Sequence, residues 1–131
     1  HARSEAGEAL TPDLLIAAYT AVNRKYYGGP VVVDDLIGYE WERIPHFYYT
    51  FYVYQYATGI SASLALAQQI LDEGQPAVDR YLRFLSSGSS DFSINLLRAA
   101  GVDMSSPEPV RRALDTFSTY VTEMEGLLGA S

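Results

Sequence analysis

Residues 46–71, HFYYTFYVYQYATGISASLALAQQIL, constrain the fold more than any other stretch. They contain no proline and a single glycine, Gly59, so no strong helix breaker interrupts them. Apolar and aromatic side chains would cover almost every side of a helix here, which is typical of a helix buried inside a large protein. We therefore predict one long, buried, aromatic-rich helix from His46 to Leu71.

Helix-start and helix-stop signals predict further helices on both sides of this stretch. Thr11 is a hydroxyl N-cap, Pro12 suits the first helical position, and Gly28 ends that helix. The remaining helices are predicted at residues 36–44 after an Asp34–Asp35 cap, at residues 76–85 and 94–100, and from residues 105–108 to about 127. Residues 31–33 are interpreted as an extended connector. The predicted fold class is all-α, with five to six helices and at most one short extended piece.

Composition excludes several classes of function. The 131 residues fit one domain or a piece of a larger one, and 48% apolar residues can bury a core. Nine Lys and Arg against sixteen Asp and Glu give a net charge of −7, which argues against nucleic acid as a partner. The lack of cysteine excludes disulfides and cysteine nucleophiles, and two histidines cannot make an all-histidine metal site. No segment has 18 uncharged apolar residues, so we expect no membrane partner.

The aromatic run from Phe47 to Tyr56 supports two interpretations. Seven of its ten residues are aromatic. At about 100° per residue, His46, Tyr49 and Tyr56 would share one helical face. Such a stripe is more often core or interface than a ligand site, because tyrosine is a large apolar ring with one polar handle. A buried face that carries an imidazole and several hydroxyls still needs polar partners, so a role in lining a cleft stays open.

The stretch KYYGGPVVVDDLIGYEWERIPHFYYTFYVYQYATGISAS (residues 25–63) resembles a known family. It is similar to the C-terminal part of the oligoendopeptidase F members of the thimet-oligopeptidase-like zinc metallopeptidases. EAGEALTPD (5–13), FLSSGSSD (84–91) and LLRAAGVDMSSPEPV (96–110) resemble the same region in the same order. The resemblance therefore extends over almost the whole chain.

The resemblance implies that residues 1–131 are the C-terminal part of a larger helical catalytic domain. The family's zinc-binding H-E-x-x-H helix lies upstream of the matched region, and this sequence contains no such motif. We therefore expect zinc in the full-length parent and none bound by this fragment, which alone should be inactive. The implied activity is zinc-dependent hydrolysis of internal bonds in short peptides, in the cytoplasm. The implied partners are those peptides and the upstream remainder of the same polypeptide.

The resemblance also implies site residues. The family uses a histidine and two tyrosines spaced seven apart on its C-terminal helix to bind the substrate and the developing oxyanion. Carried over, His46 becomes a substrate- or transition-state-binding donor, and Tyr49 and Tyr56 become oxyanion or substrate donors. Only two residues separate His46 from Tyr49, fewer than in the thimet-like branch.

Two alternatives come from other classes of protein. The chain could be a free-standing helical module that binds a peptide or ligand on its tyrosine face, or a purely structural helical bundle. A helix as apolar as residues 46–71 also predicts a sizeable exposed patch on a chain of this length. That patch would be covered by self-association or by another part of the parent.

Overall fold

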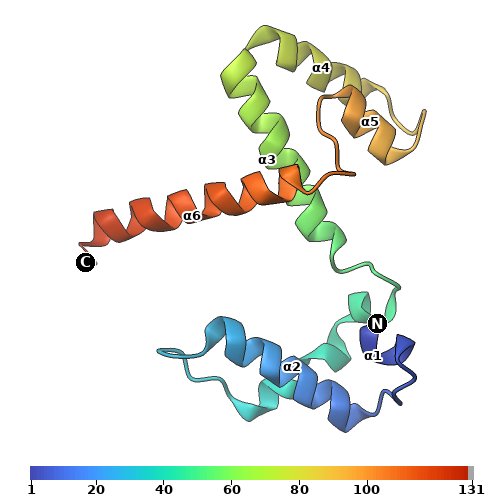
Figure 1. Ribbon diagram of the computed structural model, residues 1–131, viewed down its shortest axis with the longest axis vertical. Helices are drawn as coiled ribbons and strands as arrows, with labels where there is room; N and C mark the ends of the chain where they lie inside the picture. Colours follow the sequence, from blue (N-terminus) through green and yellow to red (C-terminus); the bar gives the residue numbers. More distant parts are fainter. Residues whose placement is uncertain (130–131) are drawn as a thin grey trace. The chain divides into compact units, whose positions relative to one another are not determined.

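The computed structural model describes residues 1–129, and the chain divides into two compact units. The first unit comprises residues 1–53 and the second begins at Tyr54. Residues 130 and 131, which the expected domain 1–131 includes, lie outside the described residues. The described residues form α-helices and 3-10 helices and contain no strand, which confirms the all-α fold class (Figure 1).

The first unit is built on a single long helix. Its elements are α1 (Ala2–Glu5), α2 (Pro12–Tyr27) and the 3-10 helices η1 (Asp35–Arg43) and η2 (Pro45–Tyr48). As predicted, Thr11 Oγ1 accepts a hydrogen bond from the Leu14 amide at 3.3 Å and so caps α2. Asp34 caps η1 in the same way, since its Oδ1 accepts from the Leu36 amide at 2.7 Å. The residues between α2 and η1 form a connector without regular structure, as expected.

Gly38 allows η1 to lie directly against α2. It is the buried residue of η1. A Cβ atom at this position would lie 2.6 Å from Thr20 Oγ1 and 2.8 Å from Ile16 Cγ2, both on α2. The two elements can therefore approach this closely only because residue 38 has no side chain. This close packing also fixes the position of Glu40, two residues further along η1.

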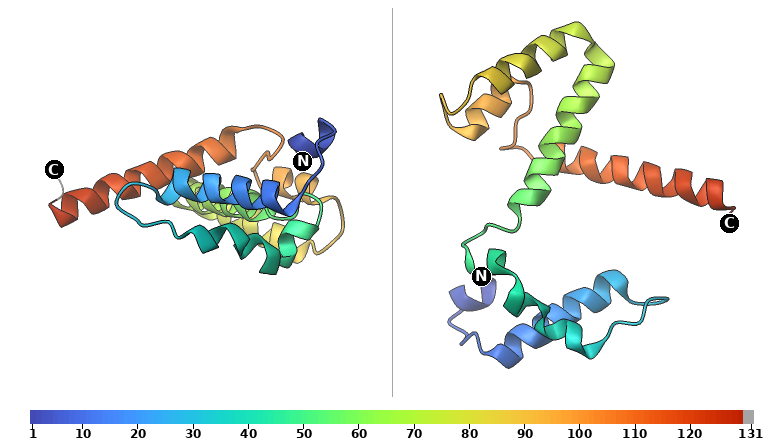
Figure 2. Two further views of the ribbon diagram at one scale, coloured as in Figure 1. Left: turned by 90° about the horizontal axis from the view of Figure 1, so that it is seen from below. Right: turned by 180° about the vertical axis from the view of Figure 1, so that it is seen from behind.

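The second unit is a helical hairpin with two further helices. Its elements are α3 (Gln55–Glu73), α4 (Gln75–Ser86), α5 (Ser93–Ala99) and α6 (Glu108–Leu128). Gly74, with φ of 67°, makes the tight turn between α3 and α4, in the gap between the helices predicted at residues 46–71 and 76–85. In this unit α5 lies beside α4, and α6 packs across α3 (Figure 2).

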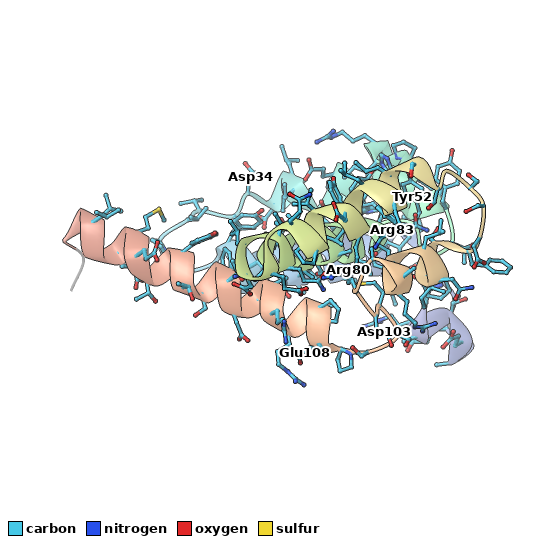
Figure 3. All side chains as sticks on the ribbon, turned by 90° about the horizontal axis from the view of Figure 1, so that it is seen from above. Asp34, Tyr52, Arg80, Arg83, Asp103 and Glu108 are labelled. Atoms are coloured by element: carbon cyan, nitrogen blue, oxygen red, sulfur yellow. The ribbon has the colours of Figure 1, made fainter. Side chains whose placement is uncertain are left out.

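A small core holds the second unit together. Ala62 and Leu66 of α3 pack against Ala100 and Val102, which follow α5. The chain after α5 is tied to α3 by Gln69, whose Nε2 donates to the Gly101 carbonyl at 2.7 Å. On α4, Arg80 forms an ion pair with Glu73 at 2.6 Å, and Figure 3 shows Arg80 among the side chains of this unit.

The predicted single helix from His46 to Leu71 is wrong over its first nine residues. Only η2 is helical there, and α3 begins at Gln55. Tyr49 is extended (φ −101°, ψ 130°), and Phe51 has a left-handed φ of 54°. Aromatic and β-branched residues lose side-chain freedom in a helix, so a dense run of them favours helix less than its apolar character suggests. His46, Tyr49 and Tyr56 consequently do not share one helical face.

The predicted burial of the aromatic run is also wrong. Across the seven aromatic residues from Phe47 to Tyr56, exposure ranges from 38% for Tyr52 to 62% for Tyr48. The run is therefore a surface of this chain and contributes nothing to a closed core. That result agrees with the expectation of an exposed aromatic patch, whose covering partner stays a prediction.

Candidate functional site

His46 lies on η2, a single turn that begins with proline. Pro45 occupies the first position of this turn and His46 the second. The His46 ring stacks on that of Tyr52, with centroids 5.3 Å apart and planes inclined by 27°. The imidazole is therefore held against an aromatic face close to the end of the first unit.

Tyr49 approaches the same ring from another direction. Its ring is 5.9 Å from the Tyr52 ring and inclined to it by 65°, an edge-to-face arrangement. The backbone supports this geometry through two consecutive turns: the Tyr49 amide donates to the His46 carbonyl, and the Tyr52 amide donates to the Tyr49 carbonyl. The structure thus brings His46 and Tyr49 together around the ring of Tyr52. Figure 3 marks Tyr52.

Tyr56 belongs to the second unit. It is the second residue of α3 and its side chain is 61% exposed. No side chain caps this helix, whose N-cap residue is Tyr54. Tyr56 therefore lies at the positive end of the helix dipole, where negative charge is stabilised. His46 and Tyr49 belong to the first unit, and their grouping with Tyr56 stays a prediction.

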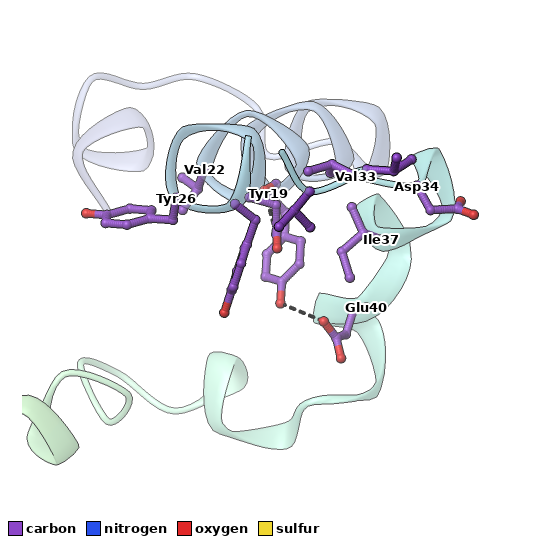
Figure 4. A pocket seen from close by; sticks show the side chains of 11 residues that line it. Tyr19, Val22, Tyr26, Val33, Asp34, Ile37 and Glu40 are labelled. Carbon is purple, nitrogen blue, oxygen red and sulfur yellow. Dashed lines mark hydrogen bonds between the residues drawn. The ribbon is translucent and has the colours of Figure 1, made fainter. Parts of the chain in front are cut away.

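A cavity of about 630 Å³ lies in the first unit. Its walls come from α2, the connector and η1, and most of the lining side chains are aromatic or aliphatic (Figure 4). The lining residues include Val22, Tyr26, Val33 and Ile37. The sequence predicted a helix, an extended connector and a capped second helix in this region, but it did not predict a cavity between them.

One polar pair lies on the wall of this cavity. Tyr19 points from α2 toward η1, and its hydroxyl donates to Glu40 Oε2 at 3.1 Å (Figure 4). Burial, together with the Glu40 carboxylate, raises the pKa of Tyr19 above its ordinary value. The phenol is therefore a hydrogen-bond donor at neutral pH. Glu40 also forms an ion pair with Arg43.

Aromatic contacts connect this polar pair to η2. The Tyr19 and Phe47 rings are arranged edge-to-face, with centroids 6.0 Å apart and planes at 89°. Tyr48 adds a second attachment, because its hydroxyl donates to the Glu42 carbonyl at 3.0 Å. Neither Tyr19 nor Glu40 was among the site residues predicted from the sequence. One signal could have indicated this pair. Tyr19 lies on the apolar side of α2, and Glu40 lies on a short helix that follows α2 and would pack against that side.

Metal ligands are not grouped within residues 1–129. No cluster of three or more His, Asp or Glu side chains there could hold a metal ion. In the same part of the chain, no helix combines the length and the apolar character needed to cross a membrane. His46 and Tyr49 offer hydrogen-bond donation from an imidazole and a phenol beside the Tyr52 ring.

Comparison with known proteins identifies the family. The sequence model of peptidase family M3 matches residues 1–116 of the chain. The chain belongs to this family. It is 56% identical over 128 residues to oligopeptidase PepF of Bacillus subtilis, a match that covers 98% of the chain and 19% of the relative. It is 41% identical to the plasmid oligoendopeptidase F of Lactococcus lactis subsp. cremoris, of which it covers 21%.

A solved structure of a peptidase shares the fold of the chain. The crystal structure of a candidate peptidase from Chlamydophila abortus superposes on 97% of the chain with a TM-score of 0.78 and 42% sequence identity. The chain covers 21% of that structure. It thus spans about a fifth of the length of the relatives that it matches. The family resemblance of the aromatic run and its flanks is confirmed.

Proposed function

We propose that the chain is the C-terminal part of the catalytic domain of a zinc-dependent oligoendopeptidase. The observation that carries this proposal is the 56% identity to oligopeptidase PepF, which extends over 98% of the chain but only 19% of the relative. The rest of the relative's length leaves room for an upstream remainder that would bind the metal. The substrates would be short peptides, cleaved at internal bonds, as the name oligoendopeptidase describes for relatives of this chain.

The described residues do not by themselves fit a zinc ion. They contain no ligand cluster and no H-E-x-x-H sequence. Zinc would accordingly be held by the upstream remainder, and its contribution in such enzymes is to activate a water molecule at neutral pH. The work proposed for this chain is to bind the peptide and to stabilise the charge that develops during its hydrolysis.

His46, Tyr49 and Tyr56 are the donors proposed for this work. Attack on a peptide carbonyl places negative charge on its oxygen, and preorganised donors stabilise that charge more than they stabilise the substrate. The contacts of His46 and Tyr49 with the Tyr52 ring support preorganisation, because they restrict both side chains before the substrate arrives. Tyr56 is supported by its exposure and by its position in the first turn of α3.

The proposal is tested by comparing the full-length parent with the isolated chain. Both are assayed on short internally quenched peptides, and zinc content is measured by mass spectrometry of the metal. The parent should hold zinc and cleave internal bonds, and the chain should do neither. A parent without zinc or without peptidase activity would contradict the proposal, as would a contaminant-free isolated chain that cleaves peptides. The second outcome would favour an independent catalytic module.

A further inference from the structure

Tyr19 contacts two elements at once and comes from a third. It belongs to α2, its hydroxyl donates to Glu40 of η1 at 3.1 Å, and its ring packs edge-to-face with that of Phe47 of η2. Phe47 directly follows His46 in the sequence. The Tyr19 side chain therefore connects α2 to the residue next to the imidazole.

η2 depends on such contacts because it is short. It is a four-residue turn of 3-10 helix, Pro45–Tyr48, and it follows the Ile44 N-cap, whose carbonyl accepts from the Phe47 amide at 3.2 Å. An isolated turn of this kind has little stability of its own, so neighbouring side chains determine its orientation. Tyr19 holds it through Phe47, and Tyr48 holds it through the Glu42 carbonyl.

The Tyr19–Glu40 hydrogen bond is well suited to fix this orientation. Both residues are half-buried, and a carboxylate acceptor makes the bond stronger than a neutral pair would. Glu40 is restrained in turn by its ion pair with Arg43 and by the close packing of Gly38 on α2. The Tyr19 ring is consequently held in one direction, nearly perpendicular to the Phe47 ring.

We infer that Tyr19 and Glu40 are positioning residues, which orient η2 and thereby place His46 as a donor to the transition state. This inference rests on the proposed function of His46. Neither residue needs to touch the substrate. Loss of their hydrogen bond would let the Tyr19 ring move, and η2 would follow through Phe47. Because catalysis is sensitive to small misplacements of a donor, the defect should appear mainly in kcat.

The test uses the full-length parent with Tyr19→Phe, which keeps the ring against Phe47 and removes only the hydroxyl. Misplacing a catalytic group by 1 Å can lower the rate by about 10²-fold, so a partial shift of η2 should lower kcat by roughly 10-fold. Tyr39→Phe is the matched control. It also removes one tyrosine hydroxyl, from the residue that precedes Glu40 on η1, and the Tyr39 side chain is 51% exposed. Tyr39→Phe should leave kcat unchanged.

A second pair of variants separates hydrogen bonding from folding. Glu40→Gln keeps an oxygen that can accept from Tyr19 and should retain most of kcat, whereas Glu40→Leu has no acceptor and should match Tyr19→Phe. Thermal unfolding of each variant checks that the fold is intact. Equal loss in Glu40→Gln and Glu40→Leu would show that the acceptor is not what matters, and would overturn the inference.

The decisive readout is a double-mutant cycle with His46→Ala. If Tyr19 acts through His46, Tyr19→Phe should have no further effect on kcat once the imidazole is gone. Full additivity of the two substitutions would overturn the inference, as would a Tyr19→Phe enzyme with wild-type kcat beside an impaired His46→Ala enzyme. An unimpaired His46→Ala enzyme would contradict the proposed role of His46 itself, and with it this inference.

Discussion

At the residue scale, one aromatic ring organises two of the proposed donors. Tyr52 presents its face to His46 and meets Tyr49 edge-to-face. Stacked and edge-to-face pairs each contribute about 0.5–1.5 kcal/mol beyond the area that they bury. Two such contacts are enough to favour one arrangement of the imidazole and the phenol. The ring of Tyr52 thus contributes preorganisation in a segment that has no regular helix.

The ring of Tyr52, more than its hydroxyl, should therefore be important for activity. In the full-length parent, Tyr52→Phe keeps both ring contacts, and its kcat should stay closer to that of the wild type than the kcat of Tyr52→Leu. Steady-state kinetics on one peptide measures the difference, with circular dichroism as the check on folding. A Leu variant at least as active as the Phe variant would show that ring stacking does not preorganise His46 and Tyr49.

Asp103 gives the second unit a pH-dependent element. The Ser105 hydroxyl, the Ser105 amide and the Arg98 guanidinium all donate to its Oδ1 and hold its pKa at about 2, below the ordinary 3.8. Figure 3 shows Asp103 close to the end of the α5 region. Because the folded pKa is depressed, the unfolded chain binds more protons between these two values. This contribution to stability is present above pH 3.8 and is lost as the pH falls through about 2.

The measurement is the urea midpoint of the chain at several pH values between 4 and 2. As the pH is lowered, the urea midpoint of the wild type should decrease. The midpoint of Asp103→Asn should decrease less steeply, because residue 103 can no longer titrate. Identical slopes for the two proteins would show that the Asp103 hydrogen bonds do not persist in solution.

At the element scale, local chemistry was sufficient to predict most helices. Several helix boundaries in the structure lie at or next to a residue with a capping or turn signal. These residues are Thr11 with Pro12, then Asp34, then Gly74 with Pro76. These signals work because a cap or a turn depends on only a few neighbouring residues. The all-α class followed directly from them.

The segment between η2 and α3 could not be predicted in the same way. Hydrophobic periodicity indicates where a face would lie if the chain were helical, but it does not show that the chain is helical. Phe51 adopts a positive φ, which is rare for an aromatic residue and which no local signal announces. The cluster around Tyr52 and the Tyr19–Glu40 bond, 21 residues apart in sequence, depend on this tertiary geometry. The sequence could therefore predict which residues belong to the candidate site, but not how their side chains are arranged in space.

Gly38 offers a test of the packing between α2 and η1. Gly38→Ala should destabilise the first unit by about 1–3 kcal/mol, because a Cβ there would collide with the stiff side chains of Ile16 and Thr20. Gly126→Ala is the control, since a Cβ within α6 meets nothing within 4 Å. That change should stabilise by about 0.5–1 kcal/mol. Chemical unfolding measures both, and equal effects would contradict the close approach.

At the scale of the whole molecule, much apolar surface is exposed. Besides the aromatic run, α6 exposes Phe117 (66%), Met124 (56%) and Leu127 (89%). Extensive exposed apolar surface is typical of sites that are covered by another protein or by more of the same chain. The covering partner proposed here is the upstream remainder of the parent, and in its absence a second copy of the chain.

The isolated chain should therefore self-associate, whereas the parent should not do so through these surfaces. Light scattering over a range of concentrations measures the mean mass, which should rise above 14.5 kDa for the chain as concentration increases. Phe117→Glu with Met124→Glu should reduce that rise. A monomer at every concentration would contradict the proposed need for a covering partner.

The central claim is that this chain supplies donors to the peptidase reaction of its parent, and kcat of Tyr56→Phe tests it most directly. The substitution removes one hydroxyl and keeps the ring. Loss of an oxyanion donor should lower kcat by about 10²–10³-fold, with zinc content and folding unchanged. Tyr49→Phe should behave similarly, and an effect mainly on KM would place the hydroxyl in substrate binding instead. Near-wild-type kcat and KM in both variants would contradict the account and assign these tyrosines to packing.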